Sequence, residues 1–473
     1  QGSILFVKGQ SGSGRPEKTV IKGNQAPVGA GLYIEGYTGG VNLSGSRGID
    51  YDLSNLVITD NVAPSYMYGG VENPGKGAGV HFYFGKEMTL EQNSTINVNM
   101  KGAEISGNKT AGNGGLGGGI YVENNAPAAK NYTINVNLNY GKVNDNVSTG
   151  NGGGIYILNE NVTSQQTGGE VLEIKGNTSL YSGGGMHIEG GGFDMTGGMI
   201  CSNAVTADDG VGAGVYINGG SLELNEGSIS ENKSASHGGG AYVAGGGNFT
   251  MSGGEMNRNN ASGNGGGVFL DGGDFEVSDG IISANTSKAG GGGAYIAGGG
   301  NFTMSGGSMS GNYTESNGGG AFLDSGELKV TDGSINDNEA DLNGGGICIL
   351  NGVVDMGSGL ITSNVCGHYG GGVYVYNSSD SVGKTVTFNG GSVTENEAEY
   401  GGGVCVDGLI TLSIGSVEIA ENTAVNGGGV CLLNKADIEF GKGQIKNNNA
   451  KVKAGTPAFQ TAWQKEIDDV AGL

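Results

Sequence analysis

A six-residue phrase that recurs about every 26 residues constrains this chain more than any other feature of its sequence. The phrase reads Gly-Gly-Gly, then an apolar, an aromatic and a second apolar residue. Clear copies are Gly238–Val243, Gly265–Leu270 and Gly291–Ile296. A repeat at a fixed period indicates that one unit cannot bury its apolar face alone, so successive units must stack. We therefore predict a solenoid.

Each repeat contains three short apolar stretches. The first is the strand that ends the glycine phrase, and the second has a Phe-x-Met pattern, as in Phe249–Met251 and Phe302–Met304. The third is a single apolar residue followed three positions later by asparagine, as Ile282 is by Asn285. Alternation with period two, punctuated by Gly, Asn and Ser, predicts half-buried strands joined by turns. No stretch of the repeat region shows helical periodicity.

Three strands per repeat predict an all-β fold, a right-handed, three-sided parallel β-helix of about 14 to 15 coils. The right-handed form is favoured because the coils are long and irregular, whereas a left-handed hexapeptide helix has short regular coils. We expect one β-helix over residues 1–448, irregular with longer loops over 1–180 and regular over 181–448. Residues 449–473, which hold the sole tryptophan, Trp463, are expected to form a C-terminal cap or tail.

A column of asparagines accompanies the third stretch. Asparagine adopts positive φ more readily than most residues, and stacked side-chain amides can bond from coil to coil. We predict a structural ladder formed by Asn24, Asn61, Asn108, Asn146, Asn177, Asn203, Asn232, Asn259, Asn285, Asn312, Asn338, Asn364, Asn396, Asn422 and Asn448.

Composition excludes several classes of partner and cofactor. Acidic residues outnumber basic ones 46 to 23, for a net charge of −23, so nucleic acid is not an expected partner. No apolar run is long enough for a membrane-spanning helix, and direct membrane insertion is not expected. The five cysteines form neither a disulfide framework nor a metal-ligand spacing, so no cofactor or metal is predicted.

Cys405 and Cys431 occupy equivalent places in neighbouring repeats. Their Cα atoms are expected about 4.8 Å apart, within disulfide range. However, in-register parallel strands point the two side chains alike, which strains a bridge. We favour free thiols, and a disulfide remains the alternative.

The glycine phrase also carries a family resemblance. Gly239-Gly240-Ala241, Gly292-Gly293-Ala294 and Gly319-Gly320-Ala321 match part of a Gly-Gly-Ala-apolar motif. In these motifs the chain resembles the right-handed β-helix adhesin-like surface proteins of bacteria and is similar to polymorphic outer-membrane protein repeats. It departs from the second motif of those repeats, having Ile, Met or Val where they have Phe. The resemblance implies an extracellular or cell-surface, bacterial and adhesive protein, and it transfers no catalytic residue.

The middle residue of each glycine-phrase strand should point outward, because its neighbours point inward. This column runs Tyr33, His81, Tyr121, Tyr156, His187, Tyr216, Tyr242, Phe269, Tyr295, Phe322, Cys348, Tyr374, Cys405 and Cys431. A solvent-facing aromatic stripe could contact sugar rings or a partner protein, and alternatively its rings stack on one another to stabilise the sheet. The candidate binding residues are Tyr121, Tyr156, Tyr216, Tyr242, Phe269, Tyr295, Phe322 and Tyr374.

The loops of the longer coils form a second candidate binding surface. The alternative is that these insertions are neutral sequence drift at turns that tolerate extra residues. The insertions cover residues 62–76, 83–96, 122–131, 158–169 and 376–384.

We predict a non-catalytic extracellular adhesin or structural rod that binds a glycan or a host or cell-surface protein. The first alternative is a filament subunit that self-associates through its coil ends, and the second is a polysaccharide-active enzyme. Asp208-Asp209, an acidic pair at an extended turn, is interpreted as a solvated loop rather than a catalytic dyad.

Overall fold

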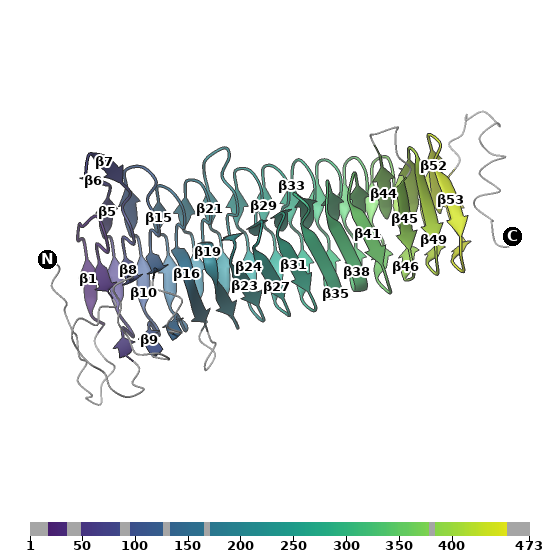
Figure 1. Ribbon diagram of the computed structural model, residues 1–473. Helices are drawn as coiled ribbons and strands as arrows, with labels where there is room; N and C mark the ends of the chain where they lie inside the picture. The colour runs from purple at the N-terminus through teal and green to yellow at the C-terminus, as the bar shows by residue number, and fades with distance from the viewer. Residues whose placement is uncertain are drawn as a thin grey trace. The chain divides into compact units, whose positions relative to one another are not determined.

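The computed structural model describes residues 18–35, 49–85, 95–125, 133–164, 171–377 and 384–451. Throughout these ranges the regular structure is β-strand, without a helix, and strands of successive coils pair in parallel as a solenoid (Figure 1). The chain divides into two compact units, Gln1–Ala235 and Ser236–Leu473, which are described separately. The predicted all-β parallel solenoid is confirmed. Its right-handed winding and its continuity over residues 1–448 stay predictions.

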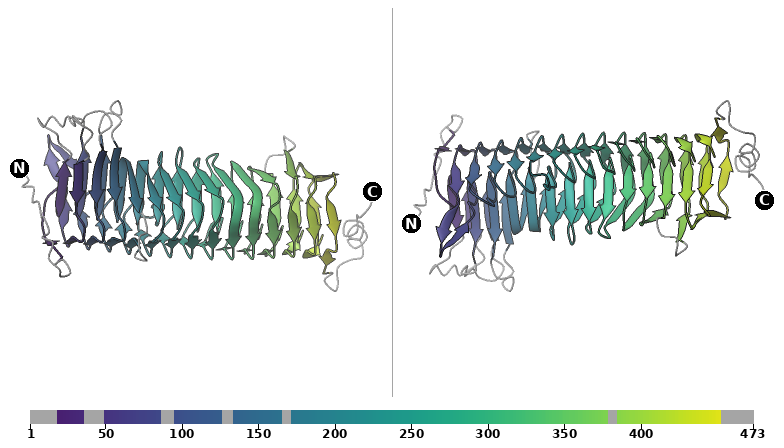
Figure 2. Two further views of the ribbon diagram at one scale, coloured as in Figure 1. Left: turned by 90° about the horizontal axis from the view of Figure 1, so that it is seen from below. Right: turned by 90° about the horizontal axis from the view of Figure 1, so that it is seen from above.

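Each regular coil contains four strand segments, one more than expected. The first column of strands follows the glycine phrase, the second contains the Phe-x-Met pattern, and the third precedes the asparagine. The fourth, unpredicted column follows the asparagine directly. Figure 2 shows the strands of each unit stacked edge to edge in these columns.

In the first unit, the first column contains β2 Leu32–Glu35, β8 Val80–Phe84, β12 Ile120–Asn124, β16 Ile155–Ser164, β19 Met186–Met195 and β22 Val215–Asn218. The second contains β3 Ile49–Asp52, β9 Thr95–Asn99, β13 Thr133–Asn137 and β23 Ser221–Leu224, with β16 and β19 extending into it. The third contains β1 Val20–Lys22, β4 Val57–Thr59, β10 Glu104–Ser106, β14 Lys142–Asn144, β17 Glu173–Lys175, β20 Met199–Cys201 and β24 Ser228–Ser230. The fourth contains β5 Val62–Pro64, β11 Lys109–Ala111, β15 Val147–Ser148, β18 Thr178–Ser179, β21 Ala204–Val205 and β25 Lys233–Ser234.

In the second unit, the first column contains β26 Ala241–Ala244, β30 Val268–Asp271, β34 Ala294–Ala297, β37 Ala321–Leu323, β40 Ile347–Ile349, β44 Val373–Tyr376, β48 Val404–Asp407 and β52 Val430–Leu433. The second contains β27 Asn248–Met251, β31 Asp274–Val277, β35 Asn301–Ser310, β38 Glu327–Asn336, β41 Val353–Met356, β45 Lys384–Phe388, β49 Ile410–Ile414 and β53 Asp437–Phe440. The third contains β28 Glu255–Asn257, β32 Ile281–Ser283, β42 Leu360–Thr362, β46 Ser392–Thr394, β50 Glu418–Ala420 and β54 Gln444–Lys446, with β35 and β38 extending into it. The fourth contains β29 Asn260–Ala261, β33 Thr286–Ser287, β36 Tyr313–Thr314, β39 Glu339–Ala340, β43 Val365–Cys366, β47 Glu397–Tyr400, β51 Thr423–Asn426 and β55 Asn449–Ala450.

The core is a set of stacked columns of identical or similar side chains. In the second unit, the rings of Phe249, Phe275 and Phe302 are fully buried and stack with centroids 4.6 and 4.8 Å apart. Each buried ring contributes roughly 1.5–3 kcal/mol of hydrophobic stabilisation, so the Phe-x-Met pattern accounts for much of the thin core.

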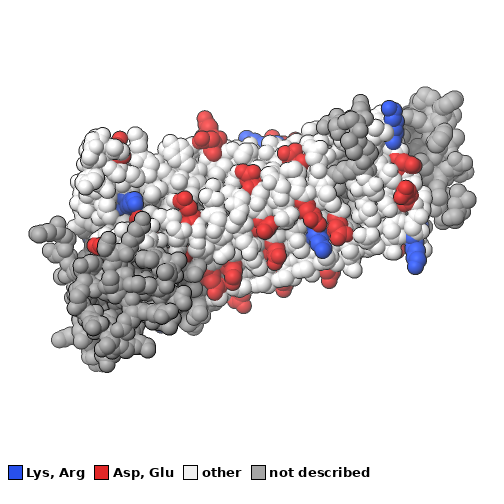
Figure 3. All heavy atoms as spheres, in the orientation of Figure 1, with Lys and Arg blue, Asp and Glu red and all other residues white. Residues whose placement is uncertain are grey.

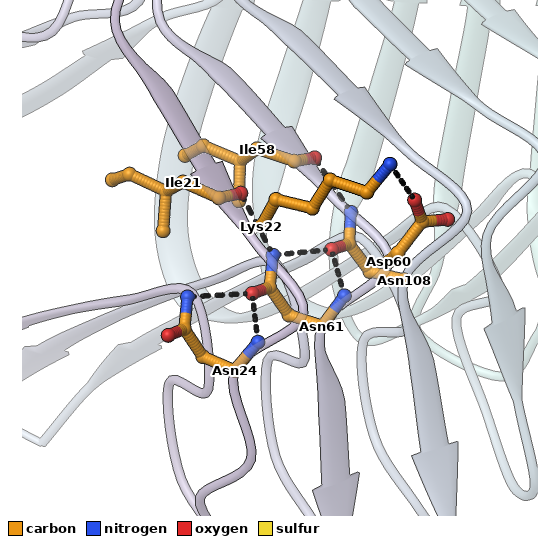
Figure 4. A network of polar contacts seen from close by, with 7 residues as sticks. All are labelled: Ile21, Lys22, Asn24, Ile58, Asp60, Asn61 and Asn108. Atoms are coloured by element: carbon orange, nitrogen blue, oxygen red, sulfur yellow. Dashed lines mark hydrogen bonds and ion pairs between the residues drawn. The ribbon is translucent and has the colours of Figure 1, made fainter.

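The asparagine ladder is confirmed within each unit. The backbone N–H and Nδ2 of Asn61 both donate to Oδ1 of Asn108, at 3.1 and 2.9 Å, and Asn61 Nδ2 also donates to the Ile21 carbonyl (Figure 4). The same pattern links Asn24 to Asn232 in the first unit and Asn259 to Asn448 in the second. These bonds satisfy buried turn groups that no water can reach.

Positive φ belongs to the residue before the ladder asparagine, not to the asparagine as we expected. Examples are Asp60 at 57°, Ala284 at 52° and Gly311 at 61°. The asparagine amide instead serves the ladder, while its predecessor turns the chain in the left-handed region.

The glycine triplets allow close contact between coils. The first glycine has positive φ, as at Gly291, and a Cβ on the second, Gly292, would lie 2.5 Å from the Gly319 carbonyl oxygen. The backbones of successive coils therefore approach more closely at the triplets than a side chain would allow.

The structure tests the predictions for the C-terminal end of the chain only in part. The expected cap or tail at 449–473 begins with β55, and from residue 452 onward it lies outside the described residues, as does Trp463. Cys405 and Cys431 are register partners and both are free thiols, as favoured.

Candidate functional site

The predicted outward column forms a run of neighbouring rings from Tyr33 to Tyr216 in the first unit and from Tyr242 to Phe322 in the second, where Cys348 then interrupts it. In the first unit the centroid separations are 5.1 Å for Tyr121–Tyr156, 4.4 Å for Tyr156–His187 and 4.6 Å for His187–Tyr216. In the second unit Tyr242, Phe269, Tyr295 and Phe322 stack at 4.9 to 5.0 Å with nearly parallel planes. The spacing follows from the register of neighbouring parallel strands.

The expectation of a solvent-facing stripe is wrong for half of the candidate residues. Tyr121 is 1% exposed, and Tyr156, Phe269 and Tyr374 are also buried. The other four, Tyr216, Tyr242, Tyr295 and Phe322, are half-buried. Within the ring stacks, the reason is that rings one strand apart cover each other's faces, so only ring edges reach the surface. Tyr374 instead lies between Cys348 and Cys405 and stacks on Tyr369. A sugar therefore has no free ring face to stack on along the interior of the column.

Carboxylates of the adjacent outward position bind the tyrosine hydroxyls. Tyr242 donates to Asp271 at 2.8 Å and Tyr156 donates to Glu189, each acid lying one coil further along the chain. Burial and the neighbouring carboxylate raise the pKa of Tyr156 far above its usual value. At these two positions the ring edge is thus an uncharged hydroxyl that the protein already binds.

A recess of about 380 Å³ opens beside this column in the first unit, and we call it the tyrosine recess. Strands β19 and β22 contribute two outward residues each, the turn before β19 contributes two, and the loop after β21 forms one wall. The lining comprises Asn151, Tyr181, Ser182, His187, Glu189, Asp209, Val211, Tyr216 and Asn218.

The loop that follows β21 makes the recess possible. It contains Asp208-Asp209, the acidic pair interpreted as a solvated loop, and the Gly210 N–H donates to the Ala207 carbonyl at 2.8 Å. Asp209 lines the recess and Asp208 does not. The acidic pair is therefore divided between a concave surface and the outside of the loop.

His187 lies in the recess between two tyrosine rings and is almost fully buried. Its Nδ1 lies 2.8 Å from Ser182 Oγ, and its Nε2 lies 3.9 Å from a Glu189 carboxylate oxygen, beyond hydrogen-bond distance. Burial lowers the pKa of His187 to about 3, so the ring is neutral at physiological pH.

Two other polar groups add to this environment. Asn151 Oδ1 is buried and has no hydrogen-bond partner among the described residues. Glu189 is paired with no lysine or arginine in the described part of the chain. The recess therefore presents a carboxylate whose negative charge no lysine or arginine of the described residues compensates.

A second polar cluster lies at the other end of the first unit's column. Lys76 Nζ lies 3.1 Å and His81 Nε2 3.4 Å from a Glu123 carboxylate oxygen. Burial opposes ionisation of Glu123, but the close His81 ring and the charge of Lys76 outweigh it and lower the pKa of Glu123 to about 2. Because the acid is already paired, this cluster is interpreted as structural.

The predicted insertion loops are described only in part. Within residues 62–76, β6 Tyr66–Tyr68 and β7 Val71–Asn73 form an antiparallel hairpin. Of the other insertions, residues 86–94, 126–132, 165–170 and 378–383 lie outside the described residues.

Sequence reasoning named three recess residues, His187, Asp209 and Tyr216, but did not bring them together. It missed Asn151, Tyr181, Ser182, Glu189, Val211 and Asn218. Two of the missed residues, Glu189 and Asn218, lie two positions after column members, so extending the outward alternation by one step would have found them. No group of three potential metal-ligating side chains occurs among the described residues.

Comparisons with protein-family models, curated proteins and solved structures find no match to this chain. The adhesin-like resemblance therefore stays a prediction. Over the described ranges, the chain contains no helix with the length and apolarity needed to cross a membrane.

Proposed function

We propose that this chain is a non-catalytic, extracellular, adhesin-like binding protein of a bacterial cell surface and that it binds a glycan in the tyrosine recess. The observation that carries the proposal is a concave site with tyrosine walls and convergent polar groups. Sugars offer apolar ring faces and hydroxyls, which suit aromatic rings and amide, hydroxyl or carboxylate groups respectively. The volume of about 380 Å³ falls within the range of ligand sites.

The tyrosine recess supports binding better than the aromatic column does. Tyr181 is 47% exposed and belongs to a turn, so its ring is not confined within the stack. Tyr216 is the one predicted binding residue that also lines the recess. We therefore place the contact with the glycan beside the column and assign the remaining column residues to stability.

The arrangement of Ser182, His187 and Glu189 favours binding over catalysis. Although the three follow one another as in a hydrolase triad, Ser182 is 6% exposed, which hinders attack on a substrate. A general base works best with a pKa near the working pH, and the pKa of His187 is about 3. These two properties argue against the polysaccharide-active alternative at this site.

A screen of immobilised neutral, acidic and amine-bearing oligosaccharides tests the proposal. We expect binding by the wild-type chain and a loss of at least about tenfold in affinity for Tyr181→Ala. Tyr376→Ala is the matched control, because Tyr376 is an outward, exposed tyrosine in β44, outside the recess. Absence of binding to every glycan, or equal affinities of the two variants, would contradict the proposal, and release of shortened sugar would contradict its non-catalytic part.

A further inference from the structure

The electrostatic character of the tyrosine recess restricts its ligand further. Two lining residues, Glu189 and Asp209, are carboxylates, and none of the lining residues is Lys or Arg. The only imidazole in the recess is neutral at physiological pH, because His187 is buried. The recess therefore carries two negative charges that the protein does not neutralise from within the lining.

The acids remain available to a ligand. Glu189 accepts a hydrogen bond from Tyr156, which leaves further acceptor capacity on a carboxylate with four lone-pair sites. Asp209 is exposed at the rim and takes part in none of the ion pairs of the described residues.

One wall also suits a cation. Tyrosine rings attract ammonium groups placed over their faces, and Tyr181, which is 47% exposed, lines the recess outside the ring stack. The remaining lining is amide and hydroxyl, from Asn218 and Ser182, which suits the hydroxyls of a sugar ring rather than an apolar ligand.

On the assumption that the proposed glycan binding is correct, we propose that the ligand is an amino sugar with a free, protonated amine, held by Glu189 and Asp209 beside the ring of Tyr181. Uronates and sulfated sugars are disfavoured, since their charge is of the same sign as the lining. The net charge of −23 acts in the same direction by repelling polyanions at longer range. On the face of the molecule seen in Figure 3, the described acidic side chains are spread among neutral ones with few lysines or arginines.

Calorimetric titration with four probes tests this inference. The probes are a glucosamine tetrasaccharide, its fully N-acetylated form, a galacturonate tetrasaccharide and tetralysine. We expect the free-amine sugar to bind at least about tenfold more tightly than the acetylated sugar, and the preference to shrink as salt is raised. We expect neither the galacturonate tetrasaccharide nor tetralysine to compete with the free-amine sugar for the recess.

Two variants locate the effect. Glu189→Gln, which can still accept from Tyr156, and Asp209→Asn should each reduce the preference for the free amine several-fold. Asp208→Asn is the matched control, since Asp208 adjoins Asp209 but does not line the recess, and it should leave the preference unchanged. Asp209 is exposed, so its variant tests the inference even if Glu189→Gln folds poorly.

The outcomes separate the two proposals. Equal binding of acetylated and free-amine sugars, with Tyr181→Ala still weakening both, would overturn the amine specificity and leave glycan binding intact. Tetralysine binding as tightly as the amino sugar would overturn the sugar class. No binding of any saccharide would overturn both proposals.

Discussion

At the scale of single residues, two adjacent positions in each ladder turn have different structural roles. The ladder asparagine forms the inter-coil hydrogen bonds, and the residue before it turns the chain at positive φ. In some coils that preceding residue is glycine and in others it is not, as Gly311 and Ala284 show. For a residue with a Cβ the left-handed conformation costs roughly 1–2 kcal/mol, so this position stores avoidable strain.

We predict that Ala284→Gly stabilises the second unit by about 0.5–1 kcal/mol, because relief of the strain at φ 52° exceeds the added chain entropy of glycine. The reciprocal change Gly311→Ala should destabilise by about 1 kcal/mol, since φ is 61° and no atom within 4 Å would meet the new Cβ. Urea unfolding of the two variants measures both effects. Effects of the same sign in the two variants would refute the role of positive φ.

At the scale of elements, the asparagine ladder connects successive coils at the turn between the third and fourth strand columns. Asn312 Oδ1 accepts from the backbone N–H and Nδ2 of Asn285, and Asn312 Nδ2 donates to the Ile282 carbonyl. All of these groups are buried, so loss of one amide leaves several of them without partners.

Asn312→Leu should therefore destabilise the second unit by about 3 kcal/mol or more, because an unsatisfied buried polar group costs about 1–3 kcal/mol. Asn301→Ala is the control, as Asn301 is exposed and its side chain donates to Asp274 at the surface. It should cost well under about 1 kcal/mol. Similar losses in both variants, measured by urea unfolding, would show that the ladder is not a special source of stability.

At the scale of the whole molecule, much of the fold could be predicted because the repeat superimposes equivalent residues. The ladder, the glycine triplets and the inward Phe-x-Met side chains all followed from the period. The fourth strand column did not, because its strands are as short as two residues and its inward side chains are small, such as Ser287 and Ala340. Such segments lack a visible apolar alternation.

The tyrosine recess could not be predicted for a different reason. Its lining comes from three coils, so that Asn151 and Asn218 share a site across 67 positions of sequence (from 151 to 218). Neither the depth of a turn such as the loop after β21 nor the mutual covering of stacked rings can be derived from period alone. To predict that Tyr121 and Tyr156 are buried, one must know the spacing of their rings, and only the structure provides it.

The first unit should lose stability in mild acid. The ordinary histidine pKa is 6.5 and that of folded His187 is about 3, so between these values the unfolded chain binds the extra proton. Stability is therefore full above pH 6.5 and falls by up to about 1.4 kcal/mol per pH unit below it. Glu123, whose pKa is about 2 when folded and 4.5 otherwise, adds to the loss below pH 4.5.

Hydrogen exchange of peptides from β19, compared at pH 7 and pH 5, measures this loss once the intrinsic rates are corrected for pH. His187→Phe should flatten the dependence, whereas the same change at the exposed His368 should not. Identical pH dependence in wild type and His187→Phe would contradict the assignment.

The most direct test of the central claim is hydrogen exchange with and without the glucosamine tetrasaccharide. If the recess binds the sugar, exchange should slow in peptides covering residues 181–189 and 206–218 and stay unchanged over 241–297, a part of the second unit that contributes no residue to the recess. Slowed exchange confined to 241–297, or no change in either region at saturating sugar, would show that the tyrosine recess is not the binding site.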